Sequence, residues 1–374
     1  MKIRSFDTPY PNPHEYGTWR AGPGGAVAEE MQQAQQDVGA DLKRFANRLS
    51  ARPTVDRAWV VCLWRAGLVD APTARRLLDG IDASLDAPDG PGGERAVIRA
   101  IGDEDIGSLV GLGRTQQEPM SRLNLRDQMC DYFAWHLCLL ETVADVAEAQ
   151  AETICPAYTH FAQAQPTTFG AYLLSVLDHL LRGLEQLELA YTFVNRNSGG
   201  CGATSGIAWE VDRAEMTRLL GFDGLVEPAF DCEASQDHSL AVCFALSNVV
   251  LGLGRTALDL EIWTMRDLEF FTVPAAWRGQ SSLMPQKAHA GSRMEALRGQ
   301  LNAVLAGTQG GVFAYKGEPH GDVLTTVSVP GRAVEALAHA KAAGRIYAGF
   351  LAALQPQTDR LLDARRREFA SASE

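Results

Sequence analysis

Four long segments of the chain carry apolar residues at three- and four-residue spacing and contain almost no proline. They span residues 126–154, 167–195, 235–271 and 292–313. Each segment predicts a helix of roughly 20–35 residues, well above the average helix length. Helices of this length usually pack side by side in a bundle, and the alternating patterns typical of strands are weak. The sequence therefore predicts an all-α fold with a long central helix bundle.

The N-terminal part of the chain has a different pattern. Residues 1–24 are rich in proline, glycine and aromatic residues and predict an irregular arm, whereas shorter helical patterns cover residues 55–66 and 71–85. We therefore expect an arm and a small helical domain over residues 1–110. The central bundle domain is expected over residues 111–349, and residues 350–374 form a separate short segment.

Loops of unusual content interrupt the bundle, and such loops on a rigid scaffold often carry chemistry. They span residues 111–125, 156–166, 197–208, 275–291 and 315–327. Five such loops, joined to long helices, are expected to converge at an end of the bundle or where several subunits meet.

Composition narrows the possible functions. The net charge of −12 excludes an extended nucleic-acid surface, because no stripe of lysine and arginine offsets the acidic background. No uncharged apolar stretch is long enough to span a membrane, and the N-terminus has no apolar core of a signal peptide. We expect a cytoplasmic protein without membrane or nucleic-acid partners. The absence of a ligand cluster or a glycine-rich phosphate loop predicts no metal and no organic cofactor.

The seven cysteines are odd in number and form no C-x-x-C motif. Most lie inside apolar runs, so we interpret them as buried free thiols of a protein in a reducing compartment. They stand at positions 62, 130, 138, 155, 201, 232 and 243.

The loop at residues 279–287 reads G-Q-S-S-L-M-P-Q-K. It resembles the signature G-S-S-x-M-P-x-K-x-N of the fumarase/aspartase superfamily, and most of all the S-S-x-M-P-Q-K-K-N-P of argininosuccinate lyases. Residues 159–166 resemble the family's T-H-x-Q-x-A-Q-P. Residues 200–213 and Ser235-Gln236-Asp237 resemble two further family segments in the same order. The resemblance covers roughly residues 55–350 and implies the same helical fold.

The resemblance also implies a reaction. Enzymes of this family remove a proton from the carbon beside a carboxylate and then expel a leaving group, so that fumarate departs. By resemblance, Ser282 is the base, and backbone N–H groups or a nearby cation must favour its alkoxide. His160 is expected just after a helix, and by resemblance it is the candidate general acid for the leaving nitrogen or a water-mediated helper. Glu295 is the candidate carboxylate that holds the tautomer of His160.

The same resemblance implies a set of substrate contacts. Lys287 is expected to anchor a substrate carboxylate as a point charge. Thr159 and Gln165 are expected to donate hydrogen bonds to the substrate carboxylates. Ser281 and Met284 of the signature loop complete this part of the predicted site.

Departures from the family pattern concern the other end of the substrate. Asp127 and Gln128 fit the family's S-R-N-D-Q, but Arg126 replaces an uncharged amide there, and a guanidinium can bind a carboxylate bidentately. His289 stands at the position of the signature asparagine. The family's Y-N-K-D-x-Q-E-D-K keeps Tyr315, whereas its glutamine becomes His320. Changed polar contacts of this kind alter specificity strongly, and we count these residues among the predicted substrate contacts.

Family resemblance further implies a homotetramer in which each active site is drawn from three subunits. Residues 350–373 resemble the entry to the family's small third domain, most of which is expected to be absent. The first functional hypothesis is a lyase that releases fumarate from an N-substituted aspartate, a small dicarboxylate. The second is a related elimination, such as release of ammonia or nitrite, or a cycloisomerase reaction in a specialised pathway. The third is a non-catalytic, crystallin-like assembly.

Overall fold

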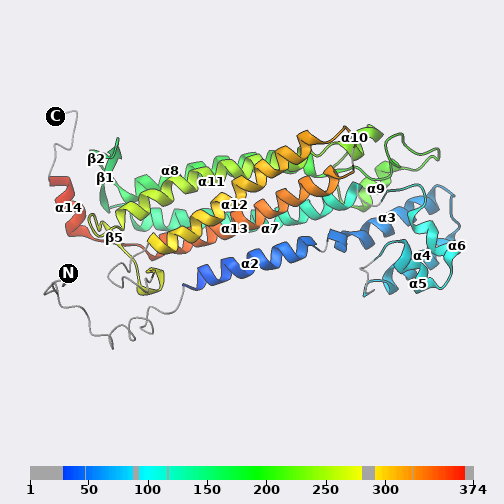
Figure 1. The fold of residues 1–374 in the computed structure, drawn as a ribbon, viewed down its shortest axis with the longest axis horizontal. Coiled ribbons are helices and arrows are strands. Elements are labelled where there is room, and N and C mark those ends of the chain that lie inside the picture. The colour runs from blue at the N-terminus through cyan, green and yellow to red at the C-terminus, as the bar shows by residue number, and fades with distance from the viewer. Residues whose placement is uncertain are drawn as a thin grey trace, which may run out of the picture.

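Long antiparallel helices dominate the molecule, and the predicted all-α bundle is confirmed (Figure 1). The computed structural model describes residues 28–46, 48–86, 92–115, 118–279, 291–321 and 323–366. The bundle consists of α7 (Glu118–Ala149), α8 (Phe169–Val194), α11 (Asp237–Trp263), α12 (Gly291–Gly317) and α13 (Thr325–Ala353).

The bundle core lies around α11, which packs against α8, α12 and α13. Its buried residues recur at three- and four-residue spacing, as in Val242, Leu246, Val249 and Leu253, because only that spacing keeps one helix face turned inward. α11 is also long and apolar enough to cross a membrane by length and composition. Within the chain, 44% of that apolar window is buried, against α8, α12 and α13.

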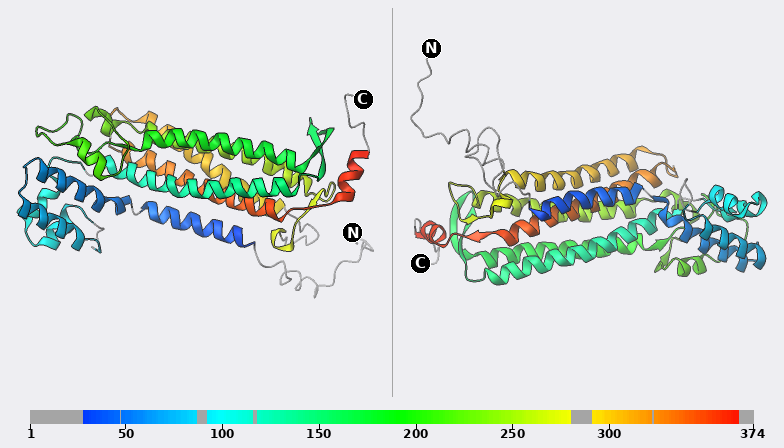
Figure 2. Two further views of the ribbon diagram at one scale, coloured as in Figure 1. Left: turned by 180° about the vertical axis from the view of Figure 1, so that it is seen from behind. Right: turned by 90° about the horizontal axis from the view of Figure 1, so that it is seen from below.

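α2 (Glu29–Ala46) lies along the bundle beside α13 (Figure 2). Its buried residues Met31 and Ala34 belong to the bundle core. Two ion pairs fix it to α13, between Lys341 Nζ and Asp41 at 3.3 Å and between Arg345 and Asp37 at 2.9 Å. α2 therefore adds a further helix to the bundle.

A second, smaller core lies at one end of the bundle. It is built by η1 (Arg48–Ala51), α3 (Arg52–Arg65), α4 (Ala71–Ala83), α5 (Glu94–Ile101), α6 (Glu104–Gly107) and η2 (Ser108–Gly111). Trp59 is fully buried in it, and the indole N–H donates to the carbonyl of Leu112 at 2.9 Å. The carboxylate of Asp56, also fully buried, pairs with Arg114 and accepts from the backbone N–H of Gly93.

Short strands occur only at the bundle ends, among the described residues. β1 (Ile154–Thr159) and β2 (Ala162–Thr168) form an antiparallel hairpin at the end that also holds α14 (Thr358–Arg366). There β5 (Phe271–Thr272), followed by η3 (Ala275–Trp277), pairs with β6 (Gln355–Pro356). The opposite end holds β3 (Arg196–Asn197), which pairs with β4 (Gly224–Leu225), and the short helices α9 (Arg213–Leu219) and α10 (Ala229–Ala234).

Several predicted element boundaries were wrong. α7 begins at residue 118, eight positions before the predicted start at residue 126, so most of the expected loop 111–125 is helical. The expected loop 156–166 is mostly the β1–β2 hairpin. α13 is absent from the predicted helices, because Pro330 interrupts its pattern inside the helix.

Candidate active site

The β1–β2 hairpin presents the predicted general acid at its tip. His160 and Phe161 form the two-residue turn with φ angles of 53° and 59°. Positive φ at both central positions is the geometry that tight hairpins prefer, but it costs free energy in residues other than glycine. His160 is exposed and Phe161 is 89% exposed. The expectation that His160 follows a helix was therefore wrong, because the residue caps a hairpin.

The two predicted hydrogen-bond donors of the hairpin flank its tip. Thr159 pairs with Ala162 next to the turn, and Gln165 lies opposite Ala157 in β2. Both Thr159 and Gln165 are exposed. The hairpin thus gathers Thr159, His160 and Gln165 on one element that projects from the end of the bundle (Figures 1 and 2).

The predicted partner of His160 lies on α12. Glu295 is exposed in the second turn of that helix. No hydrogen bond or ion pair joins His160 to Glu295 in the part of the chain that the structure describes. The predicted signature residues Ser281, Ser282, Met284, Lys287 and His289 lie outside the described residues. They belong to the connection between η3 and α12.

At the opposite end, Arg126 holds the end of α9. Its guanidinium donates to the backbone carbonyls of Gly221 at 2.8 Å and Leu220 at 3.2 Å, and to the side-chain oxygen of Asn195 at 3.3 Å. The same group stands 4.7 Å from the ring centre of Phe222. The last carbonyls of a helix lack partners within the helix, so Arg126 caps α9 in this structure.

Asp127 and Gln128 occupy the same turn of α7 but differ in burial. Asp127 is exposed, with a carboxylate oxygen 4.0 Å from Nε of Arg126. Gln128 is 5% exposed, and its side-chain nitrogen is buried without a hydrogen-bond acceptor among the described residues. A buried amide donor without a partner costs free energy.

Tyr315 and His320 lie at this second end as well. Tyr315 is half-buried in the last turn of α12, and the exposed His320 ring stacks on Phe230 of α10 at a centroid distance of 5.0 Å. In the same α10, the carboxylate of Glu233 accepts a hydrogen bond from Thr115 at 2.6 Å. Sequence analysis did not single out Glu233. A buried acidic residue is unusual in proteins, but its burial is visible only in the structure.

Sequence analysis also missed a pocket of about 270 Å³ beside α10, lined by residues including Arg122, Asp231, Asp237 and His238. Burial lowers the pKa of Arg122 to about 10, against the opposing effect of Asp237. Burial, and then the charge of Arg122, lowers the pKa of His238 well below its usual range. The neutral histidine and the buried guanidinium make this a polar pocket of mixed charge.

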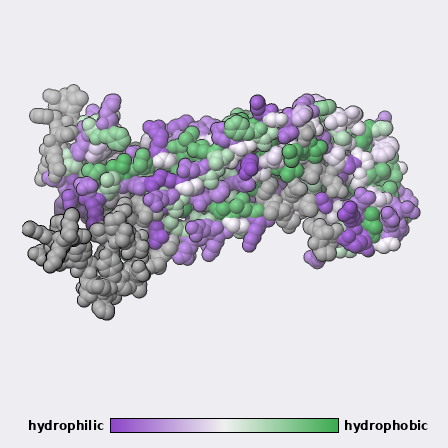
Figure 3. Space-filling model, viewed as in Figure 1, coloured by the Kyte–Doolittle hydropathy of each residue, from purple (hydrophilic) through white to green (hydrophobic). Residues whose placement is uncertain are grey.

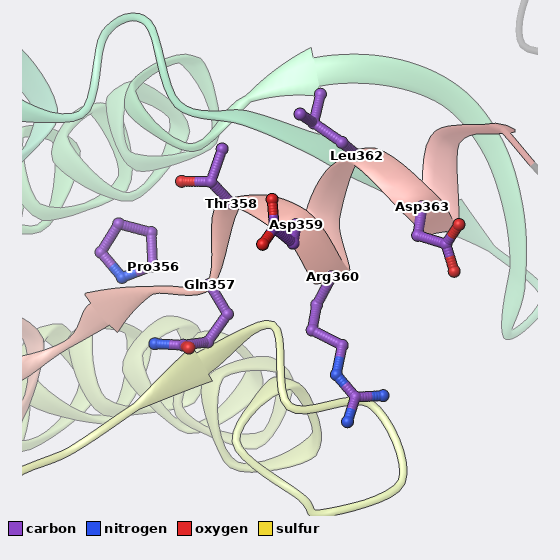
Figure 4. Close-up of a pocket in the computed structure, with 7 residues that line it drawn as sticks. All are labelled: Pro356, Gln357, Thr358, Asp359, Arg360, Leu362 and Asp363. Atoms are coloured by element: carbon purple, nitrogen blue, oxygen red, sulfur yellow. The ribbon is translucent and has the colours of Figure 1, made fainter.

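A second pocket, of about 850 Å³, lies at the hairpin end along the segment that begins α14 (Figure 4). Its lining comes from residues 356–363, and Arg360 extends toward the loop that carries Glu269, with 3.5 Å between the charged groups. None of the predicted site residues lines it. In the described part of the chain, no three His, Cys, Asp or Glu side chains gather to hold a metal ion.

The length of the helices separates the predicted site residues of the hairpin from those near Arg126. α8 has 26 residues, and a rise of 1.5 Å per residue makes it about 39 Å long. The hairpin with His160 precedes α8, whereas Asn195, the partner of Arg126, follows it. One chain therefore holds Thr159, His160 and Gln165 tens of ångströms from Arg126 and its neighbours. That gap is far wider than a small dicarboxylate.

Comparison with known proteins identifies the family to which this chain belongs. A family model described as lyase matches residues 114–305, just over half of the chain. The chain belongs to this lyase family, within the fumarase/aspartase superfamily. The matched region of this lyase-family chain includes the hairpin, the signature loop and the starts of α7 and α12.

Curated relatives and solved structures agree with that membership. The lyase-family chain is 31% identical over 301 residues to argininosuccinate lyase of Haloarcula marismortui and 29% over 275 residues to that of Methanothrix thermoacetophila. These matches cover 75% and 71% of this chain but 59% and 56% of the relatives. The chain therefore spans little more than half the length of these relatives.

Among solved structures, EDDS lyase in complex with formate matches 92% of this chain and 70% of its own, with a TM-score of 0.80 and 26% identity. A class II fumarase from Schistosoma mansoni matches 88% of this chain and 82% of its own, with a TM-score of 0.72 and 13% identity. The second likeness shows the shared fold alone.

Replacing Arg126 by methionine is expected to lower the free energy of unfolding by roughly 1.5–3 kcal/mol, since hydrogen bonds from a charged group to the end of α9 are lost. The matched control is Arg75→Met, because Arg75 is exposed and its pair with Asp79 is solvated; an exposed pair contributes about 0–1 kcal/mol. Urea unfolding followed by circular dichroism measures both. Equal small losses in the two variants would contradict the capping role of Arg126.

Proposed function

We propose that this chain is a carbon–nitrogen lyase that releases fumarate from an N-substituted aspartate. The observation that carries the proposal is the family match over residues 114–305, which includes the positions of His160, Ser282, Lys287 and Glu295. Curated relatives that align with most of this chain are argininosuccinate lyases, and a variant of the similar EDDS lyase has fumarate bound.

In the proposed reaction, Ser282 takes the proton from the carbon next to a substrate carboxylate. The electron pair left on that carbon is delocalised into the carboxylate, which Lys287 and hydrogen-bond donors at the hairpin stabilise. The C–N bond then breaks as the C=C bond of fumarate forms, and the electron pair of the broken bond stays on nitrogen. His160, oriented by Glu295, protonates that nitrogen.

The separation of the two bundle ends supports a site shared between subunits. A hairpin tip in water cannot exclude solvent from a carbanion, yet His160 and the ring of Phe161 are exposed in the single chain. Strained backbone that persists at an exposed tip is typical of functional segments. We propose that the tip reaches the site of another copy, near residues 126–128, with the signature loop from a third.

The outer faces of α8 and α11 support the homotetramer. Phe244, Leu251 and Leu258 of α11 stand seven residues apart and are 54%, 55% and 48% exposed. Leu174 and Leu181 of α8 have the same spacing and are also exposed. A seven-residue spacing keeps apolar side chains on one face, as in coiled coils. Hydrophobic residues, in green, lie along the bundle surface among hydrophilic ones, in purple (Figure 3). Contiguous exposed apolar patches often mark an interface.

The end of the site that holds the leaving group differs from the family pattern, and we propose a nitrogen group other than the guanidino arm of argininosuccinate. His320, at the position of the family's glutamine, stacks on Phe230. The guanidinium of Arg126 donates hydrogen bonds to the carbonyls of Gly221 and Leu220 at the end of α9. Asp127, Gln128 and Tyr315 then remain as candidate contacts to the substrate at this end, and His289 at the signature asparagine position is a further one.

The cellular setting is part of the same proposal. All seven cysteines are free thiols, five of them buried, whereas Cys130 and Cys138 are exposed. Exposed free thiols persist in reducing compartments. We therefore propose a cytoplasmic enzyme, with a small dicarboxylate as its substrate and copies of the same chain as its partners.

The purified full chain is expected to produce fumarate from at least one member of a panel of N-substituted aspartates, measured by ultraviolet absorbance. Ser282→Ala should lower the rate about 10²–10⁴-fold, the usual contribution of a general base. Ser50→Ala, at an exposed serine of η1, should leave the rate unchanged. Absence of fumarate from every substrate would support the non-catalytic assembly instead.

Leu251→Asp is expected to reduce the molar mass by light scattering and to abolish fumarate production, because it places a charge on the apolar face of α11. The matched control is Leu85→Asp, since Leu85 is 44% exposed outside the bundle. Circular dichroism should show unchanged helix content in both variants. A monomeric wild-type protein that still releases fumarate would refute the shared site.

A further inference from the structure

Two cysteines far apart in the sequence lie against each other at the second end of the bundle. Cys201 belongs to the glycine-rich loop after β3, and Cys232 lies in α10. They share a small cluster with Val226 and are 2% and 3% exposed. The thiol of Cys201 donates to the carbonyl of Ser198 at 3.3 Å, and the sulfur of Cys232 lies 3.4 Å from the carbonyl of Val226. The two thiols therefore lie in one small buried cluster of the folded protein.

Arg213 places a positive charge on this pair. Its Nη2 atom is 3.0 Å from Sγ of Cys232. The same guanidinium donates to the carbonyls of Gly199 at 3.1 Å and Val226 at 2.8 Å, so its position beside the sulfur is fixed by the backbone on both sides. A thiolate next to a guanidinium is a strong nucleophile at neutral pH.

The thiol of Cys232 differs from those of Cys62, Cys155 and Cys243 in its pKa. The hydrogen bond from Cys201, and then the charge of Arg213, lowers the pKa of Cys232 to about 7. Burial raises the pKa of Cys62 to about 11 and that of Cys155 and Cys243 to about 12. Only a thiolate reacts rapidly with peroxides.

Two glycines determine the backbone conformation on either side of Cys201. The flanking residues Gly200 and Gly202 have φ angles of 79° and 72°, and a Cβ atom at position 202 would lie 2.7 Å from the carbonyl of Gly206. Glycine is therefore required on both sides of Cys201. Val226, whose carbonyl contacts Cys232, and Asp231, which precedes Cys232, both line the 270 Å³ pocket. Solvent in that pocket therefore lies one residue away from Cys232.

We propose that Cys201 and Cys232 form a thiol modification site, in which a peroxide oxidises the pair to a disulfide. The Cys232 thiolate attacks hydrogen peroxide, which gives a sulfenic acid and hydroxide. The sulfur of Cys201 then displaces hydroxide from the sulfenic acid, so that the S–S bond forms. The proton of Cys201 and the proton that Cys232 released on ionisation convert the two hydroxides to water, and two thiols have lost two electrons to one peroxide.

The disulfide changes the substrate end of the bundle. It removes the thiolate that accepts from Arg213 and ties the glycine-rich loop covalently to α10. α10 also carries Glu233, which binds Thr115, and Phe230, which stacks on His320. Oxidation of the pair therefore acts on the helix whose Phe230 stacks on the candidate substrate contact His320, whatever reaction the site performs.

The test treats the full-length protein with hydrogen peroxide, blocks remaining thiols under denaturing conditions and analyses peptides by mass spectrometry. We expect one linked peptide pair that joins Cys201 to Cys232, is lighter by two hydrogen atoms and separates on reduction. All samples carry Cys130→Ser and Cys138→Ser, which removes the exposed thiols. This readout is independent of fumarate release, so failure of the proposed function leaves it intact.

Two variants identify the order of the steps. In Cys201→Ser, Cys232 should persist as a sulfenic acid that a dimedone probe labels, whereas Cys232→Ser should lose both the linked pair and the probe label. Cys155→Ser, at a buried thiol with a raised pKa, should still form the pair at the wild-type rate. Alkylation of Cys201 and Cys232 as separate thiols after peroxide treatment of the wild type would overturn the proposal.

Discussion

The length of the central helices is the constraint on which the rest of this structure depends. A bundle this long buries a continuous apolar core, but it also carries the hairpin with His160 and the turn with Asp127 to opposite ends of one chain. Chemistry that needs both groups at one small substrate then needs more than one copy. The exposed apolar residues Phe244, Leu251 and Leu258 of α11 and the exposed hairpin tip agree with the proposed assembly of several copies.

Buried and partly buried arginine side chains hold together the end of the bundle opposite the hairpin. Arg126 ties α7 to the end of α9, Arg213 ties the glycine-rich loop to the residues before α10, and Arg114 joins α3 through Asp56. Each guanidinium satisfies backbone carbonyls or a carboxylate that burial would otherwise leave unpaired, which is costly in an interior of low dielectric. A loop region with little apolar core is thereby fixed by hydrogen bonds, and Cys232 obtains its neighbouring charge from the same design.

The bundle was predictable because apolar periodicity follows directly from helix geometry, as α8 and α11 show. The start of α7 and the whole of α13 were not predicted. Pro330 and the glycine-rich segment before α7 break the apolar periodicity there, and tertiary packing stabilises the helices nevertheless. Motif resemblance named His160 but placed it after a helix, because hairpin pairing depends on register between two short strands. It assigned Arg126 to substrate, whereas the contacts of Arg126 with α9 follow from folding across 95 residues.

Subunit complementation tests the central claim most directly. His160→Asn and Ser282→Ala each remove one catalytic group, so each homomeric variant is expected to release almost no fumarate. Mixed assemblies, made by co-expression with two different tags, contain sites that take an intact His160 from one copy and an intact Ser282 from another. The account predicts that the mixed assemblies regain a fraction of the wild-type rate. Mixed assemblies as inactive as either parent, at wild-type molar mass, would contradict it.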